Sequence, residues 1–339
     1  QHIGDVENLE TVGFFEDTLR NLRNIYGLNP VAVAHDLHPD YLTTGLAKTF
    51  AEKNNLQLIP VQHHHSHIAS CMADNGLDEK VIGVVFDGLG FGADGKIWGG
   101  EFIAADLIGY ERLVHFKYVN MPGGDMATKE PWRMALSYAM DVFGEEYLSN
   151  LEAIGFMERI GIEHIKNVSK MKIRGINSTP TSSAGRLFDA VSSLLGICDK
   201  ATFEAEAAIA MESFCDGSVQ EAYSFDMTEY LLDFSETIRL IAADIISGRS
   251  KQEIASKFTN TIAVAIGHTC KRLSHDTGLD KVVLSGGVFQ NMFLLERTKW
   301  ELIINGLQVF IHGIVPANDG GLSLGQAAIA GKRLTDGRQ

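Results

Sequence analysis

Three glycine-rich turns beside short apolar runs constrain the fold of this chain more than any other feature. They occupy residues 88–95, 98–100 and 286–287, and they follow or interrupt apolar runs such as 81–86 and 96–104. Glycine lets the backbone approach a ligand closely, and free amides at such turns can donate hydrogen bonds to it. We therefore expect the three turns to line one cleft.

The other periodic segments alternate between strand and helix patterns. Strands are predicted at 30–34, 56–61, 81–86, 96–104, 281–284 and 309–311; helices are predicted at 9–26, at 42–52, through most of 131–211 and 236–275, after 287, and up to about 331. This alternation is typical of an α/β sheet that contains parallel strands. The most economical arrangement is two α/β lobes that flank a helical insert.

One glycine turn is a candidate for binding a nucleotide. Gly286 and Gly287 lie between a predicted strand and a predicted helix, where their amides could bind a phosphate or a base. The chain has no G-x-x-x-x-G-K-[ST] motif and no G-x-G-x-x-G that opens a helix. The sequence therefore supports neither a P-loop nor a Rossmann site.

Charge and cysteine content narrow the function class. The 339 residues carry 29 Lys and Arg against 43 Asp and Glu, a net charge of −14 that repels phosphate backbones. Bulk nucleic-acid binding is thus disfavoured, although a tRNA contact on one patch stays open. The four cysteines form no C-x-x-C pair, and no apolar stretch approaches the roughly 18 residues that span a bilayer. We expect a cytoplasmic protein with no membrane partner.

Four histidines stand in five positions directly after the strand at 56–61. If a helix begins here, His63 and His67 are one turn apart on one face, a spacing at which two imidazoles can bind one metal ion. The pair His64 and His67 is a weaker alternative. A solvated polar helix start, without a metal, is the other interpretation.

Two aspartates are candidates to complete such a site. Asp87 ends a predicted strand and Asp319 precedes the last predicted helix, and their carboxylates would suit Fe or Zn. Each could instead have a structural role, Asp87 in its turn and Asp319 as a helix cap. The chain offers no convincing nucleophile, because Cys71 is expected in the core. The attacking group could therefore come from a partner.

Six segments together carry a close resemblance to one family. They are residues 1–5, 35–41, 61–67, 129–133, 285–291 and 316–321. In this order they resemble the C-terminal, TsaD-like half of the HypF carbamoyltransferases, which mature [NiFe]-hydrogenase. The resemblance covers essentially the whole chain.

The resemblance implies an ASKHA (actin-like ATPase) fold with two RNase H-like lobes. We place the first lobe at 1–125, a helix-rich insert and the start of the second lobe at 126–280, and the nucleotide-binding end of the second lobe with the C-terminal helix at 281–339. Relatives carry acylphosphatase-like, zinc-finger-like and YrdC-like modules upstream, and further strands of the first lobe. The chain begins with Gln1 and matches none of these, so we expect the first lobe to be incomplete at its N-terminus.

The resemblance also implies site residues. His63 and His67 match the family's H-x-x-x-H metal ligands, Asp319 the third ligand and Asp87 the fourth. The residues that match nucleotide-binding positions are Gly99 and Gly100 on the phosphate side, Asp189 at the ribose, Asn291 at the adenine, and Glu204. Relatives often have a glycine directly after the acid that Glu204 matches, where this chain has alanine.

The implied reaction divides the work between modules. A YrdC-like module makes carbamoyl-adenylate from carbamoyl phosphate and ATP, and the TsaD-like domain passes the carbamoyl group to the C-terminal cysteine thiol of HypE, for the cyanide ligands of the hydrogenase. A divalent metal, Fe or Zn, is the implied cofactor. Three alternatives stay open: an O-carbamoyltransferase acting on a small-molecule hydroxyl, a TsaD-type tRNA threonylcarbamoyl transferase, and a nucleotide-binding lobe pair without turnover.

Overall fold

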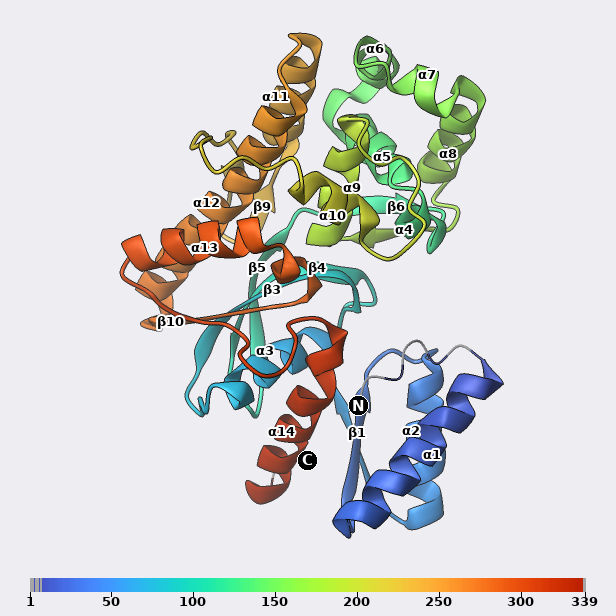
Figure 1. The fold of residues 1–339 in the computed structure, drawn as a ribbon, viewed down its shortest axis with the longest axis vertical. Helices are drawn as coiled ribbons and strands as arrows, with labels where there is room; N and C mark the ends of the chain where they lie inside the picture. The colour runs from blue at the N-terminus through green and yellow to red at the C-terminus, as the bar shows by residue number, and fades with distance from the viewer. Residues whose placement is uncertain (1–2, 4–5, 7, 338–339) are drawn as a thin grey trace.

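The chain folds around two separate sheets. The computed structural model describes residue 3, residue 6 and residues 8–337, so most of the segment 1–5 lies outside the described residues. The smaller sheet pairs β1 (Ala32–Asp36) with β2 (Gln57–Val61) in parallel. It lies at one end of the molecule, with α1 (Leu9–Tyr26) and α2 (Leu42–Asn54) beside it (Figure 1).

The first helix follows directly from its sequence. Asn8 caps α1 through a reciprocal pair of hydrogen bonds with Thr11, and Gly27 ends the helix at φ 62°. An L side chain is strained in that left-handed conformation, whereas glycine is not. The predicted helix at 9–26 is thereby confirmed.

The larger sheet has nine strands among the described residues. Its main path runs β11-β10-β3-β4-β5-β9-β8, while β7 pairs with β4 and β6 pairs with β7. The strands are β3 (Val81–Phe91), β4 (Ile97–Ala105), β5 (Tyr110–Phe116), β6 (Val119–Pro122), β7 (Ser178–Thr181), β8 (Asp226–Met227), β9 (Leu231–Asp233), β10 (Lys281–Ser285) and β11 (Gln308–Phe310). β3, β4 and β5 are antiparallel, and β10 and β11 extend the sheet in parallel beyond β3.

This pairing corrects the predicted domain boundaries. The strands within 81–116 were expected in the first lobe, but β3 pairs with β10 in the register Val282↔Ile82 and belongs to the second. The second lobe therefore begins near residue 81 and not within 126–280. Local periodicity could not show this, because a parallel pair is joined by a crossover connection, here one that spans the whole helical insert.

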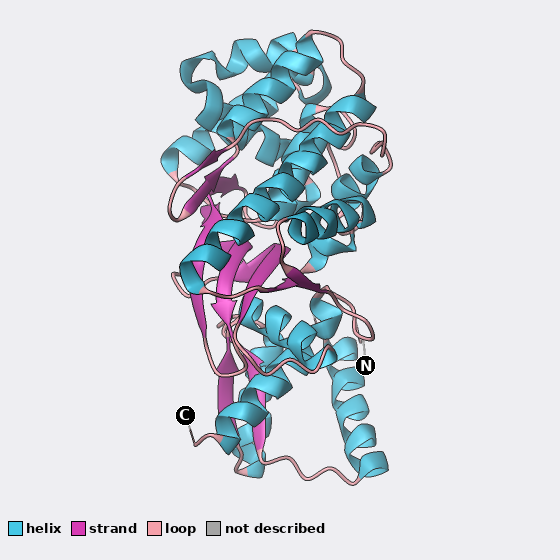
Figure 2. Ribbon diagram, turned by 90° about the vertical axis from the view of Figure 1, so that its left-hand side faces the viewer, coloured by secondary structure: helices cyan, strands magenta, loops and turns pink. Residues whose placement is uncertain are grey.

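Helices lie over the upper part of the larger sheet (Figure 2), and they form two groups (Figure 1). The first comprises α4 (Met126–Lys129), α5 (Trp132–Phe143), α6 (Tyr147–Ala153), α7 (Phe156–Ile160), α8 (Ile162–Arg174), α9 (Ala184–Leu194) and α10 (Glu206–Glu212); the second comprises α11 (Ser235–Ile246), α12 (Lys251–Thr277) and α13 (Met292–Ile304). They share one large apolar core with the sheet. The predicted helical character of 131–211 and 236–275 is confirmed, apart from β7.

Two helices join the lobes. α3 (His63–Asp74) and α14 (Leu322–Thr335) pack against each other, α3 also on β3 and β10, and α14 also on β1 and β2. The contact is close, since a Cβ built on Gly325 would lie 1.9 Å from the Ser66 carbonyl oxygen. This packing brings the start of α3 to the junction between the two sheets. Among the described residues, no helix is both long and apolar enough to cross a bilayer.

Candidate functional site

The structure brings the four predicted metal ligands together at the junction of the lobes. Nitrogen atoms of His63 and His67 and carboxylate oxygens of Asp87 and Asp319 all lie within 4.8 Å of one another. Both histidines stand in the first turns of α3, which begins where β2 ends. Asp87 comes from β3, and Asp319 from the short 3-10 helix η3 (Asp319–Gly321) before α14. Two helices and one strand thus each supply part of one cluster.

The histidine cluster is buried, which contradicts the solvated-helix interpretation. His63, His64, His65 and His67 are each at most 1% exposed. His64 and His65 point to other partners: Nδ1 of His64 lies 3.1 Å from the Gln62 side-chain amide, and Nε2 of His65 lies 2.6 Å from the Asp106 carbonyl oxygen. The one-turn pair His63 and His67 is therefore the one that faces the aspartates.

Asp87 is held in place by backbone amides. Its Oδ1 accepts hydrogen bonds from the Gly88 amide at 2.8 Å and the Gly287 amide at 3.3 Å. Its Oδ2 lies 3.2 Å from His63 Nε2 and 3.3 Å from His67 Nε2. One oxygen is thus fixed by the protein while the other faces both imidazoles. The predicted nucleotide turn at Gly287 also reaches the metal cluster through this contact.

Sequence reasoning missed Asp36, which orients His63 from behind. Asp36 ends β1, is 8% exposed, and accepts a hydrogen bond from Nδ1 of His63 at 2.9 Å. A carboxylate on the far nitrogen of a ligating imidazole fixes its tautomer and directs Nε2 toward the metal. The segment 35–41 was noted only for its resemblance. The available signal was its position: Asp36 is an aspartate that closely follows a predicted strand, and the next predicted strand leads directly into the histidine helix.

Burial and pairing act in opposite directions on the pKa values of these groups. Burial by itself lowers the pKa of His63, but hydrogen bonds to Asp36 and Asp87 raise it well above its ordinary value. The pKa of His67 is also raised, because Asp319 and Asp87 outweigh burial. Burial lowers the pKa of His65 to about 4. The neighbouring carboxylates therefore favour the protonated form of His63 and His67, whereas burial favours the neutral form of His65.

The donor set fits a divalent transition metal. Nε2 of His67 is buried and lacks a hydrogen bond of good geometry within the described structure, although Asp87 and Asp319 lie 3.3 and 3.4 Å away. Two imidazole nitrogens and two carboxylate oxygens suit Zn or Fe. Asp319 is the exposed member, with a side chain that is 66% accessible, so the cluster opens to solvent on that side.

Two of the predicted nucleotide-binding residues have buried polar atoms with incomplete hydrogen bonding. Asp189, on α9, is 2% exposed, and its Oδ2 lies 3.0 Å from Nη2 of Arg186 in an ion pair but makes no hydrogen bond of good geometry to a described residue. Asn291, before α13, uses its Oδ1 to cap that helix, while its buried Nδ2 finds no acceptor among the described residues. An acceptor and a donor of this kind are what ribose hydroxyls and an adenine ring require.

Gly99 and Gly100 do not present free amides. Both donate hydrogen bonds to Oε1 of the fully buried Glu101, at 3.1 and 3.3 Å. A Cβ on Gly100 would lie 2.4 Å from the Ser182 carbonyl oxygen, so the glycine is needed for close packing. In this structure the two amides are therefore unavailable to a phosphate, which differs from the predicted role. The carboxylate of the next residue, Glu101, accepts both amide hydrogen bonds.

The last two predicted positions lie at the edges of the site. Gly286 adopts φ 99°, and a Cβ there would lie 2.2 Å from the Phe86 carbonyl oxygen, so only glycine fits. Glu204 lies on the surface just before α10, and the next residue, Ala205, has φ 60°. This is the position where relatives often have glycine, and the left-handed backbone explains that preference.

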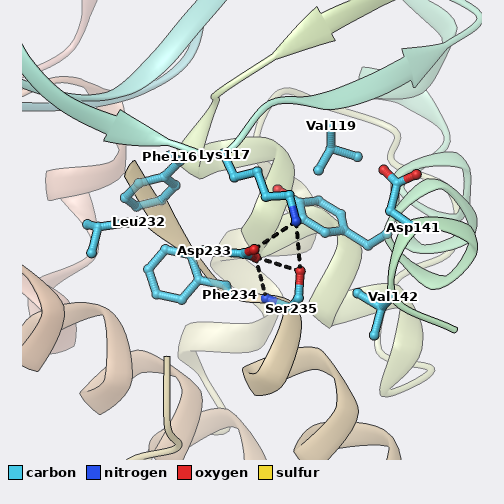
Figure 3. Close-up of a pocket in the computed structure, with 10 residues that line it drawn as sticks. Phe116, Lys117, Val119, Asp141, Val142, Leu232, Asp233, Phe234 and Ser235 are labelled. Carbon is cyan, nitrogen blue, oxygen red and sulfur yellow. Dashed lines mark hydrogen bonds and ion pairs between the residues drawn. The ribbon is translucent and has the colours of Figure 1, made fainter. Parts of the chain in front are cut away.

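Cys71 lies in the core, as predicted. It is fully buried, and burial raises the pKa of its thiol to about 12. A separate small cavity of about 20 Å³ lies between β5, β9 and the helices above them (Figure 3). Lys117 and Asp233, which form an ion pair at 2.7 Å, are among the residues that line it. It has room for about one water molecule and does not extend the site.

The fold and the site define a class of protein. Two lobes on separate sheets, joined by α3 and α14 with a His/Asp cluster at the junction, make this an ASKHA-type domain. Two family models match the chain, "HypF Kae1-like domain" at residues 1–74 and "Carbamoyltransferase, Kae1-like Domain, second subdomain" at residues 83–326. The chain therefore belongs to the HypF carbamoyltransferase family, as the Kae1-like part.

Individual relatives agree with this assignment. Carbamoyltransferase HypF of Synechocystis is 34% identical over 96% of this chain and 43% of its own length. A carbamoyltransferase HypF homolog of Cupriavidus necator is 36% identical over 90% of this chain and 78% of its own length. The crystal structure of full-length HypF in its phosphate- and nucleotide-bound form matches with a TM-score of 0.91 and 39% identity, over 98% of this chain and 52% of that one. The chain thus spans about half the length of several relatives that it matches.

Proposed function

We propose that this chain is a carbamoyltransferase that moves the carbamoyl group of carbamoyl-adenylate to the C-terminal cysteine thiol of HypE, for the cyanide ligands of [NiFe]-hydrogenase. Family membership supports the carbamoyl chemistry. The nucleotide in the matching full-length HypF structure supports an adenylate as donor. The acceptor and the adenylate follow from the resemblance and are the parts that experiment must test.

One observation carries the proposal: the candidate metal cluster and the candidate ribose acid are built on adjoining backbone. Ser183, the cap of α9, places its Oγ 2.8 Å from the Asp87 carbonyl oxygen and 2.6 Å from that of Gly88. A Cβ on Gly185 would lie 3.0 Å from the Gly88 Cα. Asp189 follows one turn later on the same helix. A single adenylate could therefore reach both.

The residues take distinct roles in this reaction. Asp189 accepts hydrogen bonds from the ribose hydroxyls, and Nδ2 of Asn291 donates to the adenine. His63, His67, Asp87 and Asp319 would hold a divalent ion, which supplies Lewis-acid polarisation of the mixed anhydride. Asp36 keeps His63 in the orientation that this requires.

The nucleophile comes from the partner. The thiolate of the acceptor cysteine attacks the carbamoyl carbon, a C–S bond forms, and the C–O bond to the phosphate breaks. AMP leaves with that electron pair. Burial raises the pKa values of all four cysteine thiols of the chain, so none is suited to act as an internal nucleophile.

Supplied carbamoyl-adenylate tests the proposal directly. The chain is mixed with carbamoyl-adenylate and HypE, and mass spectrometry follows the 43-Da mass increase that a carbamoyl group replacing hydrogen adds to the HypE C-terminal cysteine, an increase that is roughly the same for any carbamoylated thiol. We expect thiocarbamate formation that is lost when the terminal cysteine of HypE is replaced by serine. Transfer to a small-molecule hydroxyl, with HypE left unmodified, would instead favour the O-carbamoyltransferase alternative. Tight binding of carbamoyl-adenylate and HypE without carbamoyl transfer would favour the third alternative, a nucleotide-binding lobe pair without turnover.

A further inference from the structure

A buried arginine beside the candidate ribose acid has no assigned role. Arg186 is 6% exposed and stands one turn before Asp189 on α9. Its Nη2 lies 3.0 Å from Asp189 Oδ2. Its Nε and Nη1 are buried and make no hydrogen bond to any described residue, and the same holds for Asp189 Oδ2. The pair is thus in contact but far from fully hydrogen-bonded.

Two other partly buried arginines within the described residues do not share this feature. Arg112 uses all three guanidinium nitrogens, which donate to Glu101, Tyr118 and Ser182. Arg159 likewise donates from all three, to Asp199 and to two carbonyl oxygens. A buried charge with unused donors is costly, and such a group is retained where something else completes its bonding. The unused donors of Arg186 therefore indicate an acceptor that comes from outside the chain.

The position of Arg186 indicates which acceptor. A Cβ on Gly88, the residue after the metal ligand Asp87, would lie 3.8 Å from Arg186 Nη2. On its other side, Arg186 contacts the candidate ribose acid Asp189. In an adenylate the α-phosphate is attached to the 5′ carbon of the ribose, between the sugar and any group bound beyond the phosphate. Arg186 thus lies where the α-phosphate of an adenylate that spans both features would lie.

We propose that Arg186 binds the α-phosphate of the adenylate, exchanging its contact with Asp189 for the ligand when the ribose hydroxyls occupy that carboxylate. This inference rests on the proposed nucleotide site and adds to it the residue that recognises the phosphate. Guanidinium and phosphate form paired, charge-assisted hydrogen bonds along one edge of the guanidinium, and Nη2, once it leaves Asp189, can form such an edge with either unused donor. In the free chain the ion pair keeps both charges compensated. When the adenylate binds, its α-phosphate replaces Asp189 as the partner of Arg186, and its ribose hydroxyls replace Arg186 as the partners of Asp189.

The test compares AMP with adenosine, because the two ligands differ only in the phosphate. Isothermal titration measures both affinities on the full chain, with equal metal content verified in each sample. We expect Arg186→Gln to weaken AMP binding by about 10- to 100-fold while adenosine affinity stays nearly unchanged. Arg159→Gln removes another Arg–Asp pair outside the site and serves as the matched control, with the ratio of the two affinities unaltered.

A second comparison guards against loss of folding. Arg186→Gln leaves Asp189 as an unpaired buried charge, whereas Arg186→Gln combined with Asp189→Asn removes both charges at similar volume. We expect Asp189→Asn alone to keep the preference for AMP over adenosine, and the double variant to lose it. Equal weakening of both ligands, or an unchanged preference in every variant, would overturn the role of Arg186. If the unaltered chain binds neither AMP nor adenosine, the proposed nucleotide site is wrong. If it binds both and the variants keep the preference for AMP, only the role of Arg186 is wrong.

Discussion

At the scale of single residues, the pair His63 and His67 is distinguished from its neighbours by what each ring faces. We expect the double substitution His63→Ala and His67→Ala to abolish stoichiometric metal, because it removes both nitrogen ligands. His64→Gln should retain the metal, since His64 contacts Gln62 and not the aspartates. Metal analysis by inductively coupled plasma mass spectrometry on all three proteins checks this, with circular dichroism to verify folding. Metal lost from the His64 variant as well as from the double variant would point to the alternative pair, His64 and His67.

Asp36 offers a second residue-scale prediction. Asp36→Asn keeps the size of the side chain but weakens its hold on His63 Nδ1, so we expect metal affinity to fall by about 10- to 100-fold. Competition with a chromogenic chelator measures the change. Asp40, exposed in the same loop, is the matched control, and Asp40→Asn should leave affinity unaltered. Equal affinities for both variants would show that His63 is oriented by other contacts.

His312 gives a pH dependence that can be assigned to one group. Its Nε2 lies 2.8 Å from Ser285 Oγ, and burial lowers its pKa to about 4. The unfolded chain, with an ordinary histidine, therefore takes up a proton first as the pH falls from about 6.5 toward 4. Stability contributed by the neutral ring is present above that window and is lost within it. We expect His312→Gln to reduce the slope of unfolding free energy against pH there, measured by urea denaturation; an unchanged slope would contradict the burial argument.

What sequence could reveal at this scale depended on local spacing. The four candidate ligands were predictable because two histidines share a helix face and two aspartates stand at strand or helix ends. Asp36 was missed because its contact with His63 joins two separate elements, and Arg186 was missed because a sequence does not show that its guanidinium is buried with unused donors. The Gly99-Gly100 pair was given a phosphate role because a linear sequence cannot show that Glu101 folds back onto both amides.

At the scale of elements, α10 begins from a strained residue. Ala205 has φ 60°, which costs an L-residue roughly 1 to 2 kcal/mol and a glycine little. Relief of this strain is partly offset by the greater conformational entropy that glycine loses on folding. We therefore expect Ala205→Gly to raise the free energy of unfolding by up to about 1 kcal/mol. Ala208→Gly, inside the same helix, should lower it by about the same amount. Urea denaturation of both variants checks the opposite signs.

The sequence predicted where many helices and strands lie, but it did not predict which strands pair with each other. The helix at 9–26 was fixed by its apolar spacing and by Gly27, both of which are local signals. The insertion of β7 into the helical region was missed, since its four residues pair with β4 and β6 and gain their strand character only from them. The same limitation explains the misplaced lobe boundary, because the pairing of β3 with β10 joins segments separated by the whole helical insert.

At the scale of the whole molecule, one glycine controls how closely the lobes meet. Gly325→Ala places a methyl group 1.9 Å from the Ser66 carbonyl oxygen, so α14 must move away from α3. We expect a loss of about 1 to 3 kcal/mol in unfolding free energy, together with weaker metal binding because Asp319 precedes the displaced helix. Gly331→Ala, in the same helix with open space around it, should stabilise by up to about 1 kcal/mol. Chemical denaturation and chelator competition on both variants measure the two effects, and normal metal affinity in the Gly325 variant would separate lobe packing from the site.

The joining of the lobes through α3 and α14 also has a consequence for synthesis. His63, His67 and Asp87 are synthesised before Asp319, which follows only after the helical insert and β10 have been made. Throughout that interval a nascent chain exposes an incomplete set of the four donors. Under the proposed metal site, all four candidate ligands can meet only after the residues around Asp319 have emerged and α14 has packed against α3. Products of premature termination before that point would lack Asp319 and therefore the complete set of donors.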